Sequence, residues 1–412
     1  MEIYQLPPRS PEEIRETFDF IDPLKKIVIG ESVTRIIEGE PFTHPKIKTV
    51  LAAIRERFPA TTVQLTTNGT VLDRPMAEFL ARLGQVEINL SLNSSCAGTR
   101  ARLMHDRKAG EAVAAAQLLR EYHIPYHGSI VAMPHLTGWA DLEGTIRYLA
   151  AQEALTIRVF LPGHTRLAPD KLRVPLGLWA ELNSFVIKLR QKINVPLTVE
   201  PIQLADLKAM VTGVVVGSPA ERAGIKPGDR IIRVRGEAVY SRVDAFEKIR
   251  RAGGMAPLEL SRGGEVFFTA VEKRALASSG LVMDYDVHPG LPAAIGRVIN
   301  GSGCSSALLM TSLLAKDVIR CICPDIPTDA RLEIMPVASR YFGGNIVSAG
   351  LLMVEDFAAA WAERAGEAGS MGGARPDLIL LPAVAFDGRG RDLTGRSYHE
   401  LTDITGTKVM IC

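Results

Sequence analysis

The 412-residue sequence predicts an α/β protein of three domains, and three observations support this prediction. Short apolar runs alternate with helix-length segments over residues 10–160, which is typical of βαβ units and a parallel sheet, either open or curled into a full or partial barrel. From 211 to 272 the pattern changes to closely spaced glycines and short strands, as in a small β-rich module. Strand–helix alternation then resumes. We therefore expect domains at 1–195, 205–275 and 278–412.

Composition narrows the classes of function. A hydrophobic content of 47% is enough for real cores, and a net charge of +2 without a dense basic block indicates no nucleic-acid partner. No apolar run is long enough for a membrane span, and the N-terminus does not resemble a secretory signal. The five cysteines are scattered and odd in number, which favours a reducing compartment. We expect a cytoplasmic protein without disulfides; its cysteines are Cys96, Cys304, Cys321, Cys323 and Cys412.

The N-terminal domain is expected to begin with a capped helix. Ser10 is a good N-cap, Pro11 suits the first helical position, and Glu13 completes a capping box. The strands expected after it are 26–29, 34–37, 62–66, 86–91, 127–131 and 156–160, separated by helices at 46–57, 74–83, 110–122 and 141–152. In such sheets ligands bind at the carboxyl ends of the strands.

The rest of the chain predicts a further helix, a linker and a second α/β pattern. Residues 177–192 form an amphipathic helix, and Pro196 and Pro201 mark a linker. In the C-terminal domain, we expect a strand at 298–299 that leads into a helix at 305–317. Further strands are expected at 332–335 and 378–381, and a mobile Ala/Gly-rich loop at 362–375.

The middle module contains a string of turn signals over residues 217–231. Ser218 can cap a one-turn helix, and Gly224 can end it with a positive φ. Asp229 follows a Pro-Gly turn and precedes a strand at 230–234, and a helix is expected at 242–251.

This string resembles the PDZ domains of bacterial HtrA-like and site-2 proteases. PDZ domains bind an extended peptide or a protein C-terminus at a sheet edge, so the resemblance implies a groove along a strand at 211–216. The alternative is a PDZ domain that only packs against its neighbours. The resemblance places Val211, Gly213 and Val215 in the peptide-binding strand.

A protease is not supported by the catalytic motifs. The sequence has no His-Glu-x-x-His and no Gly-Asn-Ser-Gly-Gly. Cys304 follows Gly303 where a helix is expected to begin, and a helix N-terminus lowers the pKa of a thiol. A small packed residue is the better interpretation of Cys304.

Four segments of the N-terminal domain resemble motifs of the radical S-adenosylmethionine (SAM) superfamily. They are Glu38-Gly39-Glu40-Pro41, Thr66-Thr67-Asn68-Gly69-Thr70, Asn89-Leu90-Ser91-Leu92-Asn93 and Gly128-Ser129-Ile130. The order of the motifs strengthens the resemblance, which implies a partial parallel β/α barrel that binds SAM. The first segment would then meet the methionyl amine, Asn68, Ser91 and Asn93 would lie at the strand ends near SAM, and Gly128 and Ile130 would line the adenine.

The C-terminal third extends this resemblance. Its strings Arg340-Tyr341-Phe342-Gly343-Gly344-Asn345-Ile346 and Phe386-Asp387-Gly388 are similar to the domain of unknown function in bacterial radical SAM proteins that carry a PDZ domain. In those relatives the PDZ domain precedes the catalytic domain, whereas here it follows. Gly343 and Gly344 offer an anion site assisted by Arg340, or a tight turn.

The family holds a [4Fe–4S] cluster on a Cys-x-x-x-Cys-x-x-Cys loop before the Glu38 segment, and this chain has no cysteine before Cys96. Cys321 and Cys323 share one face of an expected strand, but no second pair completes a metal site, so we expect no metal ligands. Either the sequence starts within a longer enzyme, which the short stretch before Gly39 favours, or it belongs to a relative that lost its cluster.

These observations leave two hypotheses. The first is a radical SAM-type enzyme that acts on an unknown substrate and is inactive in this chain because the cluster cysteines are absent. The second is a non-catalytic scaffold whose PDZ domain binds a peptide or a protein C-terminus. The sequence identifies no catalytic residue for either hypothesis.

Overall fold

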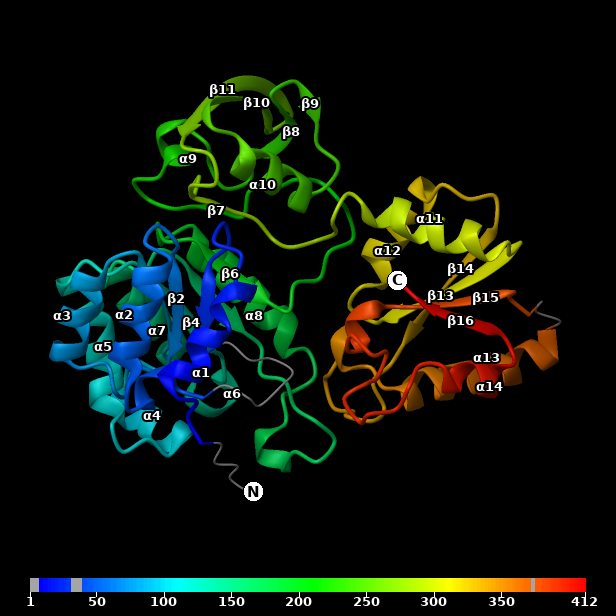
Figure 1. Ribbon diagram of the computed structural model, residues 1–412, viewed down its shortest axis with the longest axis horizontal. Helices are drawn as coiled ribbons and strands as arrows, with labels where there is room; N and C mark the ends of the chain where they lie inside the picture. The colour runs from blue at the N-terminus through cyan, green and yellow to red at the C-terminus, as the bar shows by residue number, and fades with distance from the viewer. Residues whose placement is uncertain (1–6, 31–38, 372–374) are drawn as a thin grey trace.

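The computed structural model describes residues 7–30, 39–371 and 375–412. Glu38 and the strand expected at 34–37 lie outside the described residues. Figure 1 shows a blue-to-green N-terminal domain, a β-rich middle domain packed above it, and a yellow-to-red C-terminal domain at its side. Within these ranges, no helix combines the length and apolar character needed to cross a membrane.

Six parallel strands form the N-terminal sheet in the order β1-β2-β3-β4-β5-β6, so strand order follows chain order. This arrangement is that of an open, partial β/α barrel, as the sequence predicts. The strands are β1 Ile27–Ile29, β2 Val63–Thr67, β3 Val86–Ser91, β4 Tyr126–Val131, β5 Ile157–Phe160 and β6 Leu197–Glu200.

Strand β6 corrects the expected linker between Pro196 and Pro201. The two prolines lie just outside the strand. Because proline has no backbone N–H to donate, this position removes no hydrogen bond from within the strand. Leu197 and Val199 point into the core and are buried. Four residues are enough for a sixth strand because β5 supplies the partner edge.

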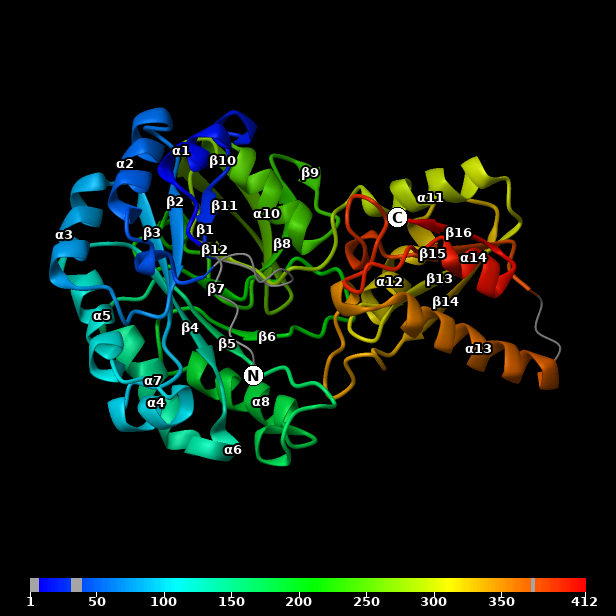
Figure 2. The ribbon, with the colours of Figure 1, turned by 60° about the horizontal axis from the view of Figure 1, so that its bottom comes forward.

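Helices cover one face of this sheet, as Figure 2 shows. Ser10 and Glu13 form the expected capping box at the first of them, and Asp73 caps the third through the N–H of Met76. The helices of the domain are α1 Pro11–Glu16, α2 Ile47–Arg57, α3 Arg74–Leu83, α4 Ala97–Met104, α5 Ala109–Glu121, α6 Pro134–Thr137, α7 Trp139–Ala151 and α8 Leu178–Arg190, with short 3₁₀ turns at Phe18–Phe20, Pro41–Thr43 and Asp170–Leu172.

The middle domain has the small β-rich structure that its turn signals predict. Ser218 accepts from the N–H of Glu221, and Gly224 has a φ of +73°, as the expected one-turn helix requires. Its strands are β7 Gly213–Val214, β8 Arg230–Val234, β9 Glu237–Ala238, β10 Gly254–Arg262, β11 Glu265–Lys273 and β12 Leu281–Val282, and its helices are α9 Pro219–Arg222 and α10 Arg242–Arg251. The order β11-β10-β8-β9 forms one sheet, and β12 pairs with β7.

The C-terminal domain has a parallel sheet in the order β14-β13-β15-β16. Its strands are β13 Ser306–Ser312, β14 Arg331–Val337, β15 Leu378–Leu381 and β16 Lys408–Ile411. Its helices are α11 Leu291–Ser302, α12 Lys316–Ile322, α13 Val354–Met371 and α14 Glu400–Thr405, with 3₁₀ turns at Cys323–Asp325, Ala349–Leu351 and Ala383–Ala385.

Two expectations for this domain are wrong. The residues at 298–299 belong to helix α11, which ends at Gly303 with a φ of +68°, and 306–312 is a strand instead of a helix. A strand buried on both faces reads as a continuous apolar run, which periodicity alone does not separate from a buried helix. Cys304 therefore follows a helix C-terminus, and its thiol does not face a helix N-terminus.

Two further segments are helical where another structure is expected. Helix α13 extends to Met371, so most of the expected loop at 362–375 is helix, because alanine favours helix enough to offset its interspersed glycines. Cys321 lies in α12 and Cys323 in the 3₁₀ turn after it, so they do not share a strand face.

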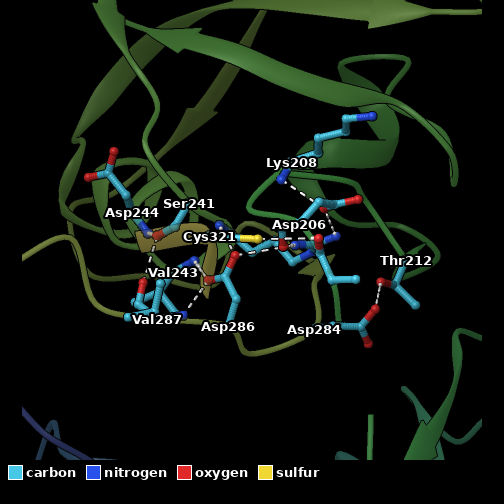
Figure 3. A network of polar contacts seen from close by, with 12 residues as sticks. Asp206, Lys208, Thr212, Ser241, Val243, Asp244, Asp284, Asp286, Val287 and Cys321 are labelled. Carbon is cyan, nitrogen blue, oxygen red and sulfur yellow. Dashed lines mark hydrogen bonds and ion pairs between the residues drawn. The ribbon is translucent and has the colours of Figure 1, made fainter. Parts of the chain in front are cut away.

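A polar junction joins the linker after β6 to the middle and C-terminal domains (Figure 3). Arg242 of α10 donates from Nη2 to Asp206 of the linker at 2.7 Å and from its backbone N–H to Asp286 at 2.8 Å. The side chain of Asp286 is fully buried. Cys321 of the C-terminal domain donates from Sγ to the carbonyl of Ala205 at 3.3 Å. The linker is thus bonded to the middle domain through Asp206 and to the C-terminal domain through Ala205.

Candidate functional site

Glu40 organises the carboxyl ends of β1 and β2. Its Oε1 accepts from Thr67 Oγ1 at 2.6 Å and its Oε2 accepts from the N–H of Asn68 at 2.8 Å. The same carboxylate accepts from the N–H of Phe42 and so caps the turn that Pro41 begins. The Gly-Glu-Pro and Thr-Asn-Gly segments, which are far apart in sequence, therefore form one unit. Gly39 lies exposed beside it.

Arg100 of helix α4 connects this unit with β3. Only 1% of the residue is exposed, and it donates to the carbonyls of Asn68 at 2.9 Å and of Ser91 at 3.3 Å. Its charge is balanced by Asp106, with Nε 2.9 Å from Oδ2. No motif in the sequence assigns Arg100 a role of its own. Its position in the first helix after β3 is a signal for this role, because the backbone carbonyls at the strand ends need hydrogen-bond donors.

Asn93 continues the connection to β4. Its Oδ1 accepts from the N–H of Val131 at 2.9 Å, and its Nδ2 contacts the sulfur of Met104 at 3.2 Å. Asn68, Ser91 and Asn93 thus lie along neighbouring strand ends, where the sequence places them.

Gly128 and Ile130 face the helices. A Cβ on Gly128 would lie 2.8 Å from Leu149 of α7, and Ile130 is fully buried. Because side chains alternate along a strand, Ser129 points to the opposite, partly exposed face. There it pairs with Ser91 on β3 and with Arg158 on β5, which makes a polar row across the open face. A ligand on that face meets this row, and Gly128 and Ile130 lie behind it.

A charged network occupies the other half of the open face. His127 contacts Glu87 at 2.5 Å through Nε2 and Thr156 at 2.7 Å through Nδ1, while Lys26 donates to Glu87 at 2.7 Å. Burial alone would raise the pKa of Glu87, but the hydrogen bonds from His127 and Lys26 outweigh it and lower the pKa to about 2. Lys26, Glu87 and His127 had no assigned role in the sequence analysis, although polar residues at every second strand position indicated this face.

The cysteines do not form a cluster site. Cys96 caps α4 at the carboxyl edge, where hydrogen bonds from Thr99 lower the pKa of its thiol. The other four cysteines lie in the C-terminal domain. In the part of the chain that the structure describes, no group of three or more His, Cys, Asp or Glu side chains is placed to hold a metal ion. A [4Fe–4S] cluster requires thiolate ligands together, so the residues present do not fit it.

Val211 and Val215, which flank strand β7, already use backbone groups in hydrogen bonds within the domain. The N–H of Val211 donates to Asp229 at 2.8 Å, its carbonyl accepts from Gly228, and the N–H of Val215 donates to Gly280. Gly213 faces Pro196 of the N-terminal domain, where a Cβ would lie 2.5 Å from that ring. The strand expected over 211–216 is therefore shorter, and it pairs with β12 in a sheet of only two strands.

The segment of Gly343 and Gly344, where the sequence offers an anion site or a tight turn, contacts a loop of the N-terminal domain. Asn345 accepts from the N–H of His164 at 2.7 Å and donates from Nδ2 to Pro162 at 3.0 Å. Gly344 has a φ of +64°, and a Cβ there would lie 2.0 Å from the carbonyl of His164. A carbonyl oxygen fills the space that an anion would need, and Arg340 pairs with Glu363.

Residues 3–149 match the model of the radical SAM superfamily, and residues 210–260 match that of the PDZ domain. The chain therefore contains a radical SAM domain followed by a PDZ domain, as the motifs predicted.

Two solved structures are examples of its similarity to known proteins. SuiB of Streptococcus suis bound to S-adenosylmethionine is 17% identical, with a TM-score of 0.33 over 40% of this chain and 36% of that chain. A radical SAM methyltransferase from Sphaerobacter thermophilus is 22% identical, with a TM-score of 0.32 over 42% of this chain and 52% of that chain. The matched regions thus span about a third to a half of these proteins.

Proposed function

We propose that the N-terminal domain binds SAM at the carboxyl edge of its sheet, with the methionyl ammonium at Glu40. The observation that carries this proposal is the unit formed by Glu40, Thr67 and Asn68 in a domain of the radical SAM superfamily. An ionised carboxylate offers about four acceptor positions, so Glu40 keeps capacity for a charged donor beyond the hydrogen bonds that hold it.

The neighbouring strand ends suit the remainder of SAM. Gly39 and Pro41 set the backbone beside Glu40, while Asn68, Ser91 and Asn93 follow along β2 and β3. The row of Ser91, Ser129 and Arg158 provides hydroxyls and a cation for the ribose and the carboxylate. In such enzymes SAM is cleaved when it accepts an electron from a reduced cluster, and the described residues of this chain place no set of ligands that would hold one. We expect it to bind SAM without cleaving it.

Isothermal titration calorimetry of the full chain with SAM tests the proposal. Glu40→Gln keeps the side-chain shape and one acceptor oxygen but removes the charge, and we expect the affinity to fall about 10- to 100-fold. Glu56→Gln, on an exposed position of α2, is the matched control and should bind as the unaltered chain does. Absence of SAM binding to the unaltered chain would contradict the proposal.

Anaerobic reconstitution with iron and sulfide, followed by electron paramagnetic resonance, tests separately whether this chain can hold a [4Fe–4S] cluster. We expect no [4Fe–4S] signal, because one thiol at the strand ends is too few. A cluster signal that disappears in Cys96→Ser would contradict this expectation. It would not contradict the proposal that the domain binds SAM.

The PDZ domain supports a second function, which is binding of a peptide C-terminus. The favouring observation is that β12 has β7 as its single strand partner in this sheet, as β-addition of a peptide requires. Fluorescence polarisation with a library of C-terminal peptides is the direct test. Binding should require the free carboxylate, so the same peptides with C-terminal amides should bind weakly. Equal binding of both forms would rule out this mode of recognition.

A further inference from the structure

A cavity of about 680 Å³ lies where the N-terminal and C-terminal domains meet. One wall comes from the end of β6 and from the linker after it, with Glu200, Pro201 and Leu204. The other walls come from helices α11 and α12 and from the ends of three strands of the C-terminal sheet. Its size falls within the range of small-molecule sites, about 300 to 1,000 Å³.

The position of this cavity follows from the strand order β14-β13-β15-β16. The chain leaves β13 toward β14 on one side and later returns to β15 on the other, so the connections diverge at the carboxyl ends of β13 and β15. In doubly wound sheets, this reversal of strand order opens the crevice in which ligands bind. Thr311 near the end of β13 and Pro382 after β15 both line the cavity, which therefore occupies that crevice.

The cavity lining is mainly aliphatic. Leu291 and Ile295 of α11 face it from one side and Val318 and Ile319 of α12 from another. Water in such a space finds few hydrogen-bond partners, so an apolar ligand gains the full hydrophobic contribution on entering.

Glu200 gives one end of the cavity a polar character. Its carboxylate is held by the backbone N–H of Ile202, and burial, together with the nearby charge of Asp284, raises the pKa of Glu200. A carboxylate in poor contact with water is stabilised by a further donor. A ligand with a hydroxyl or ammonium end supplies one, whereas an anionic end is repelled.

We infer that this cavity is a binding site for a small molecule with a hydrocarbon body and a hydrogen-bond-donating end, which lies at Glu200. The site lies at β6 and the C-terminal domain, away from the carboxyl ends of β1–β4. Asp286, which lines the cavity, also holds Arg242 of the PDZ domain, so all three domains contribute to its surroundings.

Nile red, an uncharged apolar dye, is a suitable probe for the full chain, and 1-octanol, octylamine and octanoate are its competitors. We expect saturable fluorescence enhancement, displaced by octanol and octylamine and far less by octanoate. Ala315→Phe, which places a ring in the cavity at the start of α12, should lower the dye affinity about tenfold or more. Ala293→Phe, the same change on an exposed position of α11 outside the cavity, should leave it within about twofold.

Glu200→Gln tests the polar end alone. The dye should still bind, and octanoate should now compete nearly as well as octanol. Val384→Trp, at the exposed mouth of the cavity, replaces Ala315→Phe if the latter fails to fold by circular dichroism. The inference is overturned if Nile red does not bind, if a folded cavity variant binds it unchanged, or if octanoate is the best competitor of the unaltered chain.

Discussion

Replacement of Glu87 by Gln measures how much the charged network on the open face stabilises the N-terminal domain. The pKa of Glu87 falls from 4.5 to about 2 on folding, so the folded domain binds fewer protons than the unfolded chain. At about 1.4 kcal/mol per pH unit, this shift contributes about 3 kcal/mol above pH 5. The contribution decreases as pH falls toward 2, and about 1 kcal/mol remains at pH 3.

Urea unfolding in a Trp361→Phe background provides the assay, because the two remaining tryptophans, Trp139 and Trp179, lie in the N-terminal domain. Glu87→Gln should lower the free energy of unfolding by about 3 kcal/mol at pH 7 and by about 1 kcal/mol at pH 3. Glu143→Gln removes an exposed helical ion pair and should cost less than about 0.5 kcal/mol at both pH values. An equal loss from Glu87→Gln at pH 7 and pH 3 would refute the linkage argument.

Three further outcomes follow from the contacts. Arg100→Met should destabilise the N-terminal domain by about 3 kcal/mol, because it leaves the largely buried carboxylate of Asp106 without its cationic partner; urea unfolding checks this. Gly344→Ala should separate the loop at 162–166 from the C-terminal domain, since a Cβ there collides with a carbonyl, and limited proteolysis of that loop should become faster. Asp229→Asn removes the charge of a fully buried carboxylate that bonds Arg262, and the hydrogen exchange of β8 should increase without change in the C-terminal sheet.

The sequence predicts the parts of the fold that local signals specify. Ser10, Ser218 and Gly224 each adopt the cap or turn conformation that their residue types favour. In each strand of the N-terminal sheet from β1 to β5, apolar residues recur at every second position and face the layer of helices. Prediction fails where tertiary burial decides the structure. Residues 306–312 are apolar on both faces, and only their position between β14 and β15 makes them a strand.

The candidate site is predictable only in part. The order of the motifs predicts that Glu40 lies near the strand ends of Asn68 and Ser91, and in the structure Glu40 accepts a hydrogen bond from the N–H of Asn68. The hydrogen bonds of Arg100 depend on the way α4 turns back over β3, which no local pattern contains. The side chains on the open face depend on strand register, which decides that Ser129, and not Gly128 or Ile130, points to that face.

The contact between His164 and Asn345 has a consequence for synthesis of the protein on the ribosome. The two residues are 181 positions apart in the chain. At about 5 to 20 residues per second, the loop after β5 is made roughly 10 to 40 s before the segment that holds it. Leu167 and Leu176 of this loop are highly exposed even in the finished fold. The nascent N-terminal domain therefore presents this apolar loop to chaperones and proteases until the C-terminal domain emerges and docks.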